Sequence, residues 1–293
     1  MGIWQSKQEY STDVSINQTI MKFCSLDSSD MLKQHYEKRR MEASDCAPDW
    51  IKNLTEKLGA FTSAPEMAGL GALAVAVFID MKFSSPQEES TKDALRCVFA
   101  EQKASEVRDL IDHCLETCWT YIDNAGKLRS ELERIDGQLS AALTKLKNSM
   151  LDDGHLTNNA LKAWVNGAAF RIQMMIHQVR LGGTDTYVKR LLSAYQNNLE
   201  SLFTEHKEMI RKKCKLDRVM RYDEDPDPNG PEYMFFGENS NFFDYGHDLD
   251  FDDCFNRYYY HIYGKQWRDN ENHFSYVTEN LQRLVSLRGS INF

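Results

Sequence analysis

Hydrophobic positions recur in alternating steps of three and four residues through a long central part of the chain. Fourteen consecutive steps of this kind, from Cys97 to Leu146, each place an apolar, small or aromatic residue. The positions are Cys97, Ala100, Ala104, Val107, Ile111, Cys114, Cys118, Tyr121, Ala125, Leu128, Leu132, Ile135, Leu139, Ala142 and Leu146. A 3.5-residue repeat predicts helix with an apolar seam that faces a partner helix. Gly126 and Gly137 each weaken a helix by about 1 kcal/mol, so a kink or break near either one fits the pattern.

Two shorter stripes follow the turn sequence LDDGHLTNN. The first comprises Leu161, Val165, Ala168, Ile172, Met175 and Val179, and the second comprises Val188, Leu192, Tyr195, Leu199, Leu202, His206 and Met209. Because the connections are short, neighbouring helices should pack antiparallel. Helices are also expected over 29–43 and 48–61. The sequence thus predicts a helical bundle over residues 29–221, preceded by a flexible N-terminal arm over 1–28.

The composition changes after the last stripe. A basic run, RKKCKLDRVMR, is followed by an acidic run, YDEDPDPNGPE, and then by a segment rich in Phe, Tyr and Trp. Such aromatic density does not suit a solvated linker, so residues 222–293 should form an acidic loop and an aromatic segment packed on the bundle. A last helix is expected from Phe274 to Leu287. The predicted fold is all-α: a bundle of long antiparallel amphipathic helices with an irregular aromatic-rich C-terminal cap.

Composition limits the classes of function. The 293 residues are 42% hydrophobic and 27% charged, the profile of a folded chain, and the net charge of −9 does not favour nucleic-acid binding. The seven cysteines are odd in number and irregularly spaced, and no secretory signal pattern precedes them. Reduced thiols in the cytosol are therefore expected. No stretch reaches the roughly 20 apolar residues of a spanning helix.

The first residues, MGIWQS, match the pattern for N-myristoylation, with Gly2 as the acylated residue and Ser6 as the required hydroxyl residue. One myristoyl chain binds membranes with an association constant of only about 10⁴ M⁻¹, so a second signal is needed. Palmitoylation of Cys24 is one candidate. A second is contact between anionic lipid and the basic cluster, which comprises Arg211, Lys212, Lys213, Lys215 and Arg218. The alternative is that these cations offset the dipole at a helix C-terminus or pair with the neighbouring acidic run.

A third candidate is insertion of the run MAGLGALAVAVFI, from Met67 to Ile79. Its membrane-contact residues would be Met67, Leu70, Leu73, Val75, Val77, Phe78 and Ile79. The alternative is a helix wholly buried in the bundle. A short apolar segment beside long amphipathic helices resembles the layout of helical pore-forming proteins such as the cytolysin A-like and apolipoprotein L-like groups. The resemblance rests on layout alone and transfers no residue roles.

Metal and catalytic signatures are weak. Asp225, Asp227 and Asn229 reproduce the first half of a calcium-binding EF-hand loop, but Phe236 stands where the bidentate carboxylate is needed, so a rigid acidic turn is the alternative. Cys114 and Cys118 lie on the apolar seam and indicate buried thiols. His206 is expected to be a hydrogen-bonded core residue. No nucleophile elbow, phosphate-binding loop or zinc-protease motif occurs. We therefore expect a non-enzymatic protein without a cofactor.

Two functional hypotheses lead, and a cation sensor built on the acidic loop is a weaker third. The first is a cytoplasmic, N-myristoylated helical protein that acts peripherally at membranes, by binding, remodelling or pore-type insertion of residues 67–79. The second is a soluble scaffold or adaptor that self-associates through its seam or binds a protein partner through its aromatic segment.

Overall fold

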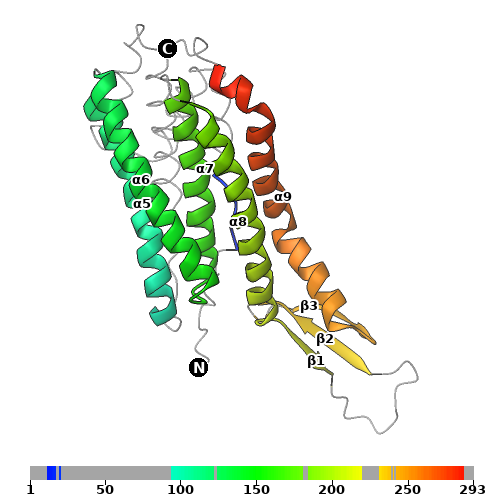
Figure 1. Ribbon diagram of the computed structural model, residues 1–293. Helices are drawn as coiled ribbons and strands as arrows, with labels where there is room; N and C mark the ends of the chain where they lie inside the picture. Colours follow the sequence, from blue (N-terminus) through cyan, green and yellow to red (C-terminus); the bar gives the residue numbers. More distant parts are fainter. Residues whose placement is uncertain are drawn as a thin grey trace, which may run out of the picture.

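The fold of the described chain is mostly helical. The computed structural model describes residues 12–17, 20, 94–121, 124–180, 184–219, 231–238, 240 and 242–286. Its elements are α5 (Ala94–Tyr121), α6 (Ala125–Leu151), α7 (Asn158–Arg180), α8 (Thr186–Arg211), β1 (Lys215–Arg218), β2 (Glu232–Phe236), β3 (Phe242–His247) and α9 (Phe251–Ser286). The helices lie side by side and the strands form a small sheet at one end (Figure 1). The helical expectation is confirmed, whereas the term all-α is too narrow.

The long hydrophobic seam belongs to two helices rather than one. Residues 122–124 separate α5 from α6, and the Asn124 side chain caps α6 by accepting a hydrogen bond from the backbone of Lys127 at 3.0 Å. Ion pairs of 3.6 Å join Lys103 to Asp153 and Lys145 to Glu106. As residue numbers increase along α5, the numbers of the partner residues in and just beyond α6 decrease, so the two helices are antiparallel. The seam therefore folds back on itself, and its positions with described side chains, other than the half-buried Tyr121, are buried within one chain.

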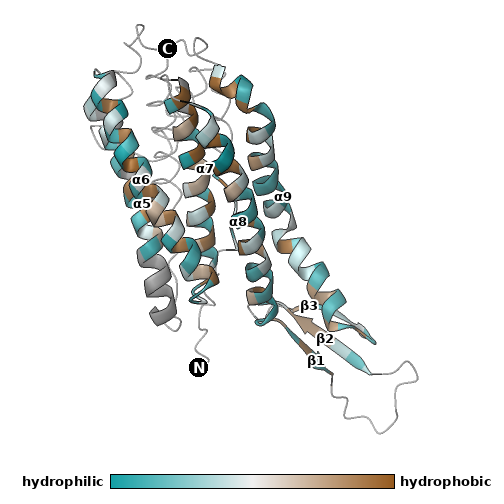
Figure 2. Cartoon of the chain, in the orientation of Figure 1, coloured by the Kyte–Doolittle hydropathy of each residue, from teal (hydrophilic) through white to brown (hydrophobic). Residues whose placement is uncertain are grey.

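Helix α7 lies at the centre of the bundle. It packs against α5, α6, α8 and α9, and nearly every side chain from Ala160 to Ile176 is buried. Hydrophobic positions gather where the helices face one another (Figure 2). A Cβ atom at Gly167 would lie 2.6 Å from Val107 and 2.9 Å from Leu143, so the absence of a side chain lets α7 approach α5 and α6 closely. The stripes expected on α7 and α8 are confirmed by their burial.

A buried arginine in the bundle binds several partners at once. The Arg171 side chain of α7 is 3% exposed and forms a two-pronged pair with Asp136 of α6, with N–O distances of 2.6 and 3.2 Å. Arg171 also donates to the hydroxyls of Tyr195 at 2.9 Å and Tyr187 at 2.6 Å. These contacts join α6, α7 and α8.

The C-terminal region is regular, which corrects the expected irregular cap. Helix α9 begins at Phe251, far before the expected Phe274, and its aromatic side chains cover α8. The buried stripe runs along the helix through Phe255, Tyr259, Tyr263, Asn270, Phe274, Val277, Leu281 and Leu284. The remaining aromatic residues belong largely to β2 and β3. The aromatic segment does pack on the bundle, as expected, but as a helix and a sheet.

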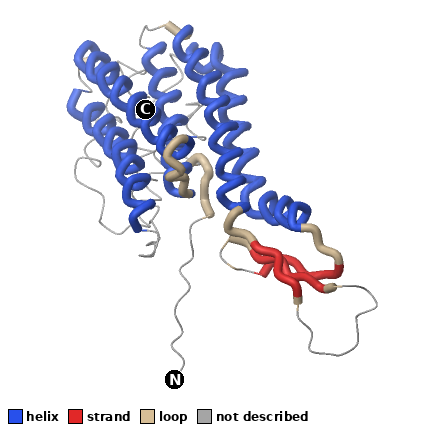
Figure 3. The backbone as a smooth tube through the Cα atoms, turned by 60° about the horizontal axis from the view of Figure 1, so that its bottom comes forward, coloured by secondary structure: helices blue, strands red, loops and turns tan. Residues whose placement is uncertain are grey.

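The sheet is antiparallel with the order β1-β2-β3. Its register pairs Lys215 with Phe236 and Glu232 with His247. Figure 3 shows the strands projecting from the end of the bundle where α8 ends and α9 begins. The helices expected over 29–43 and 48–61 lie outside the described residues.

Candidate functional site

The outer face of the sheet exposes two aromatic side chains. Phe242 is 59% exposed and Tyr245 is 47% exposed. Residues three apart on a regular strand would face opposite sides. Here Phe236 pairs with Phe242 while Phe235 pairs with Asp244, so β3 holds an extra residue, Phe243, in a bulge. The bulge brings Phe242 and Tyr245 to the same face, opposite the one that covers α9.

The inner face of the same sheet is packed. Phe235 is fully buried and its ring centroid lies 5.7 Å from that of Phe251 and 6.0 Å from that of Tyr258. Phe243, the bulged residue, lies 5.3 Å from Tyr258. Since the inner aromatics anchor the sheet to α9, the outer ones are held in place on a fixed surface.

Four cations lie at the same end of the molecule, and the strand pairing divides the two on β1 between the faces. Lys215 pairs with Phe236 on the outer face, whereas Arg218 pairs with Tyr233 and lies on the opposite face. Lys212, Lys213, Lys215 and Arg218 are exposed where α8 ends and β1 runs, and none of them forms an ion pair with another described residue. We call Phe242, Tyr245, Lys212, Lys213 and Lys215 the sheet-end surface. The exposed carboxylate of Asp217, which pairs with Met234, lies on the same face. Arg211, the fifth residue of the predicted basic cluster, is different: it pairs with Asp252 and lies 5.2 Å from the ring of Phe251. Arg211 therefore fixes α8 to α9.

A chain of buried polar groups lies behind the sheet. The Trp267 indole donates to the Tyr259 hydroxyl at 2.8 Å, and that hydroxyl lies 2.9 Å from His206 Nδ1. His206 Nε2 lies 3.0 Å from Asn158 Oδ1, an acceptor, so the neutral ring carries its proton on Nε2 and accepts from Tyr259 at Nδ1. The chain continues from the Asn158 amide to the Tyr263 hydroxyl at 3.2 Å. His206 is thus a hydrogen-bonded core residue, as expected.

The chain ends at a carboxyl group, where the Tyr263 hydroxyl donates to Glu238. Burial raises the pKa of Glu238, opposed by the hydrogen bond from Tyr263 and the charge of Lys213. Burial lowers the pKa of His206 to about 3, with a further contribution from Lys213. His206 is therefore neutral at physiological pH. The hydrogen bonds of this chain join α7, α8 and α9 to the segment that follows β2.

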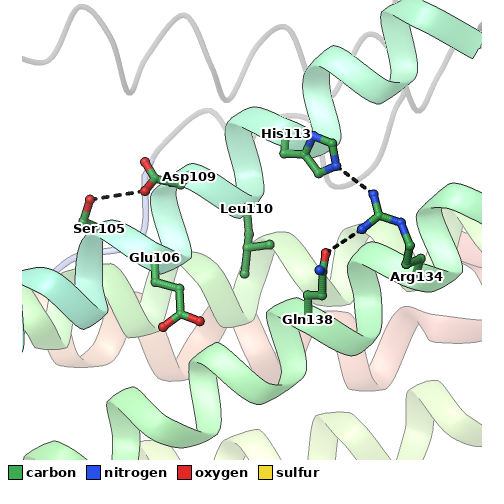
Figure 4. Close-up of a pocket in the computed structure, with 7 residues that line it drawn as sticks. All are labelled: Ser105, Glu106, Asp109, Leu110, His113, Arg134 and Gln138. Atoms are coloured by element: carbon green, nitrogen blue, oxygen red, sulfur yellow. Dashed lines mark hydrogen bonds between the residues drawn. The ribbon is translucent and has the colours of Figure 1, made fainter.

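A shallow groove of about 610 Å³ opens between α5 and α6 (Figure 4). It is lined by Ser105, Glu106, Asp109, Leu110, His113, Arg134 and Gln138. The Arg134 side chain bonds to His113 at 2.8 Å, to Gln138 at 3.1 Å and to Glu131 at 2.9 Å. Since these groups bind one another on an exposed helical surface, we assign no ligand to this groove.

The described thiols are buried in the core. Cys114, Cys214 and Cys254 are free cysteines, and the Cys114 thiol contacts the sulfur of Met174 at 3.8 Å. Burial raises the pKa of Cys214 to about 12, so this thiol is protonated at neutral pH. The expectation of a buried thiol holds for Cys114. The side chain of Cys118 is not among those described.

Metal-ligand clusters are absent from the described residues, where no three His, Cys, Asp or Glu side chains are grouped to hold an ion. Asp250 accepts a hydrogen bond from the backbone of Asp253 at 3.0 Å, so it caps the start of α9. The proposed calcium ligands Asp225, Asp227 and Asn229 lie outside the described residues.

Several other predicted site residues also lie outside the described ranges. They are Gly2, Ser6, Cys24 and the run from Met67 to Ile79 with its contact residues. Across the part of the chain that is described, no helix combines the length and apolar character needed to cross a bilayer.

The hydrophobic pattern did not predict Phe242 and Tyr245 as site residues. A signal existed, because two aromatic runs, EYMFF and FFDYGH, flank the short polar segment GENSN, which is typical of a β-hairpin. The bulge that gives both side chains the same face has no such signal.

Comparisons with known protein families, curated proteins and solved structures find no match to this chain.

Proposed function

We propose that this protein is a peripheral membrane-binding helical protein of the cytoplasm, acylated at Gly2, that meets anionic lipid with its sheet-end surface. The observation that carries the proposal is the coincidence of exposed Phe242 and Tyr245 with three exposed lysines, Lys212, Lys213 and Lys215, at one end of the molecule. Aromatic side chains favour the membrane interface and cations favour anionic headgroups. No enzymatic activity or cofactor is part of the proposal.

The energetics support a two-signal attachment. A cation near an anionic surface contributes about 1 kcal/mol, so the three lysines together contribute about 3 kcal/mol at most, and the charge of Asp217 opposes them. Burying the exposed parts of the two rings adds about 2 kcal/mol. Neither this surface nor one acyl chain alone gives stable attachment, whereas their combination does.

The N-terminal segment is oriented so that both signals can reach one membrane. Gln266 donates to the carbonyl of Thr12, and Asn270 accepts from the amide of Ile16, so residues 12–17 run in the same direction as α9, with Thr12 nearer the sheet. Gln266 lies fifteen residues after Phe251, about 22 Å along the helix. The ten residues from Gly2 to Thr12 span up to about 34 Å. A lipid on Gly2 can therefore extend to the sheet end.

The test is vesicle co-sedimentation of the full chain purified from eukaryotic cells, with phosphatidylcholine vesicles that contain or lack phosphatidylserine. Phe242→Ser with Tyr245→Ser should weaken binding about 30-fold, as expected for about 2 kcal/mol. Tyr276→Ser, an exposed aromatic on the far half of α9, is the matched control and should bind as the natural sequence does. Intact-mass measurement of the same preparation reports the acyl group, and Gly2→Ala should remove it.

Equal binding by the double variant and the natural sequence would contradict a role for the sheet-end surface. Absence of the acyl group would remove the Gly2 part of the proposal independently. Remodelling or pore-type insertion by Met67–Ile79 is an extension of the same proposal, and dye release from anionic vesicles tests it.

The second candidate is a scaffold or adaptor that binds a protein partner. Because the α5–α6 seam is buried within one chain, the seam gives self-association no support, and the exposed rings of Phe242 and Tyr245 become the recognition surface for this alternative. Two results together would favour the scaffold. Proximity labelling would recover one protein with the natural sequence but not with Phe242→Ser/Tyr245→Ser, and the natural sequence would not bind vesicles.

A further inference from the structure

The N-terminal segment 12–17 lies extended in a groove between α7 and α9, and three carboxamide side chains hold its backbone. Gln266 accepts from the amide of Val14 at 2.6 Å and donates to the carbonyl of Thr12 at 3.0 Å. Asn270 accepts from Ile16 at 2.8 Å and donates to Val14 at 2.9 Å. Each carboxamide thus bonds two peptide groups, as a neighbouring β-strand would.

The opposite edge of the segment is held in the same way by α7. Asn166 accepts from the amide of Asn17 at 2.7 Å and donates to the carbonyl of Ser15 at 3.0 Å. All six of these hydrogen bonds use side-chain groups of the helices and backbone groups of the segment. The backbone is therefore read without regard to the identity of its side chains.

The spacing of the α9 carboxamides matches an extended peptide. Gln266 and Asn270 are four residues apart, which is about 6.0 Å along a helix. Residues two apart on a strand are separated by about 6.6 Å. Successive carboxamides on one helix face therefore meet successive peptide groups on one strand edge, and two such contacts form without distortion of either backbone.

Side chains add selectivity to this backbone recognition. Val14 and Ile16 point into the core and are 0% and 2% exposed, and Ile20 beyond them is 1% exposed. Asp13 pairs with Lys162 of α7. The groove thus accepts an acidic residue followed by apolar residues at alternate positions.

We propose that the α7–α9 groove is a peptide-binding site that the chain fills with its own residues 12–17, and that it accepts the same extended peptide as a separate molecule. The recognised ligand class is an extended peptide with the pattern acidic, apolar, any, apolar. The cis segment competes intramolecularly with a separate peptide, so a peptide in trans binds only when the segment is displaced. This inference does not depend on membrane binding.

The experiment uses the full chain with Val14→Asp and Ile16→Asp, which places two charges in the apolar positions and displaces the segment. A fluorescent peptide of residues 10–21 is titrated into this variant and into the natural sequence. The peptide should bind the variant with one-to-one stoichiometry and at least about tenfold more tightly than it binds the natural sequence. Adding Asn270→Leu to the variant should weaken binding at least about tenfold, whereas Asn280→Leu, on the same helix but outside the groove, should leave it unchanged.

Failure of the peptide to bind the folded variant, or equal binding to both proteins, overturns the proposal. If the variant does not fold, hydrogen exchange of the natural protein decides. Exchange at Val14 and Ile16 while α7 stays protected shows that the segment detaches from an intact bundle. Exchange at these amides only together with α7 shows that the segment is inseparable from the core, and the proposal fails.

Discussion

Mild acid should destabilise this protein because two buried histidines must remain neutral in the folded state. Burial lowers the pKa of His206 to about 3, with Lys213 adding to the effect, and lowers that of His273 to about 4. Protonation of His206 at Nδ1 would turn a second donor toward the Tyr259 hydroxyl, which already accepts from Trp267. The Tyr259 proton would then lose its acceptor, and a charge would be buried.

The sign and size follow from proton linkage. A histidine with an unfolded pKa of 6.5 binds protons in the unfolded state at a pH where the folded state binds none, so stability falls as the pH drops below 6.5. Between pH 7 and pH 5 each histidine removes about 2 kcal/mol, and the pair removes about 4 kcal/mol. That loss is a large share of a typical stability of about 5–15 kcal/mol.

Glu238 acts with the opposite sign. Because burial raises its pKa, the folded state takes up this proton more readily than the unfolded state, so stability rises as the pH falls toward 4.5. Glu238→Gln keeps an acceptor for Tyr263 but removes the charge. We expect this variant to be at least as stable as the natural sequence at pH 7 and to show the full histidine loss at pH 5.

Urea unfolding followed by circular dichroism at several pH values between 7 and 5 measures these effects. His273→Leu should reduce the acid-induced loss of stability by about half, or about 2 kcal/mol, because it removes one of the two buried groups that titrate. The substitution breaks no hydrogen bond at Nε2, which has no partner among the described groups. His206→Asn should do the same, from a lower starting stability. An unfolding free energy that is constant from pH 7 to pH 5 in the Glu238→Gln background would refute the reasoning.

Two further predictions concern packing in the bundle, and both are read from urea midpoints. Asp136→Ala leaves the Arg171 cation buried without its counter-ion and should lower the free energy of unfolding by about 3–5 kcal/mol. The double variant Asp136→Leu with Arg171→Met should lose much less stability, because no charge is left buried. An Asp136→Ala variant as stable as the natural sequence would contradict this reasoning. Gly167→Ala should destabilise by about 1–2 kcal/mol net of its gain in helix propensity, because its methyl group meets Val107 and Leu143; an increase in stability would show that α7 can shift.

Local periodicity was sufficient to predict α7 and α8. Their stripes are apolar at nearly every position, and short polar turns separate them, so the pattern and the burial agree. The break between α5 and α6 could not be located in this way, because Tyr121 and Ala125 continue the seam spacing across the turn. The turn depends on the cap at Asn124, a polar residue that the hydrophobic pattern does not contain.

The helix α9 was concealed by polar residues within its buried stripe. Asn270 and His273 are 0% and 5% exposed. Both are polar residues at buried positions, so each interrupts the apolar period of the helix. Asn270 is polar because it binds residues 14 and 16, more than 250 positions away in sequence. No window of local sequence contains both partners. The docked segment could therefore not be predicted, and neither could the shared face of Phe242 and Tyr245, which depends on a bulge. The cations of the candidate site could be predicted, because they are adjacent in the sequence.

The position of Gln266 and Asn270 near the end of the chain also sets an order of events during synthesis. The carboxamides that hold residues 12–17 leave the ribosome only some 250 residues after the segment itself. At about 5–20 residues per second, this delay is on the order of 10–50 s. During that interval the segment is still without its groove, so the proposed acylation of Gly2 has time to precede docking.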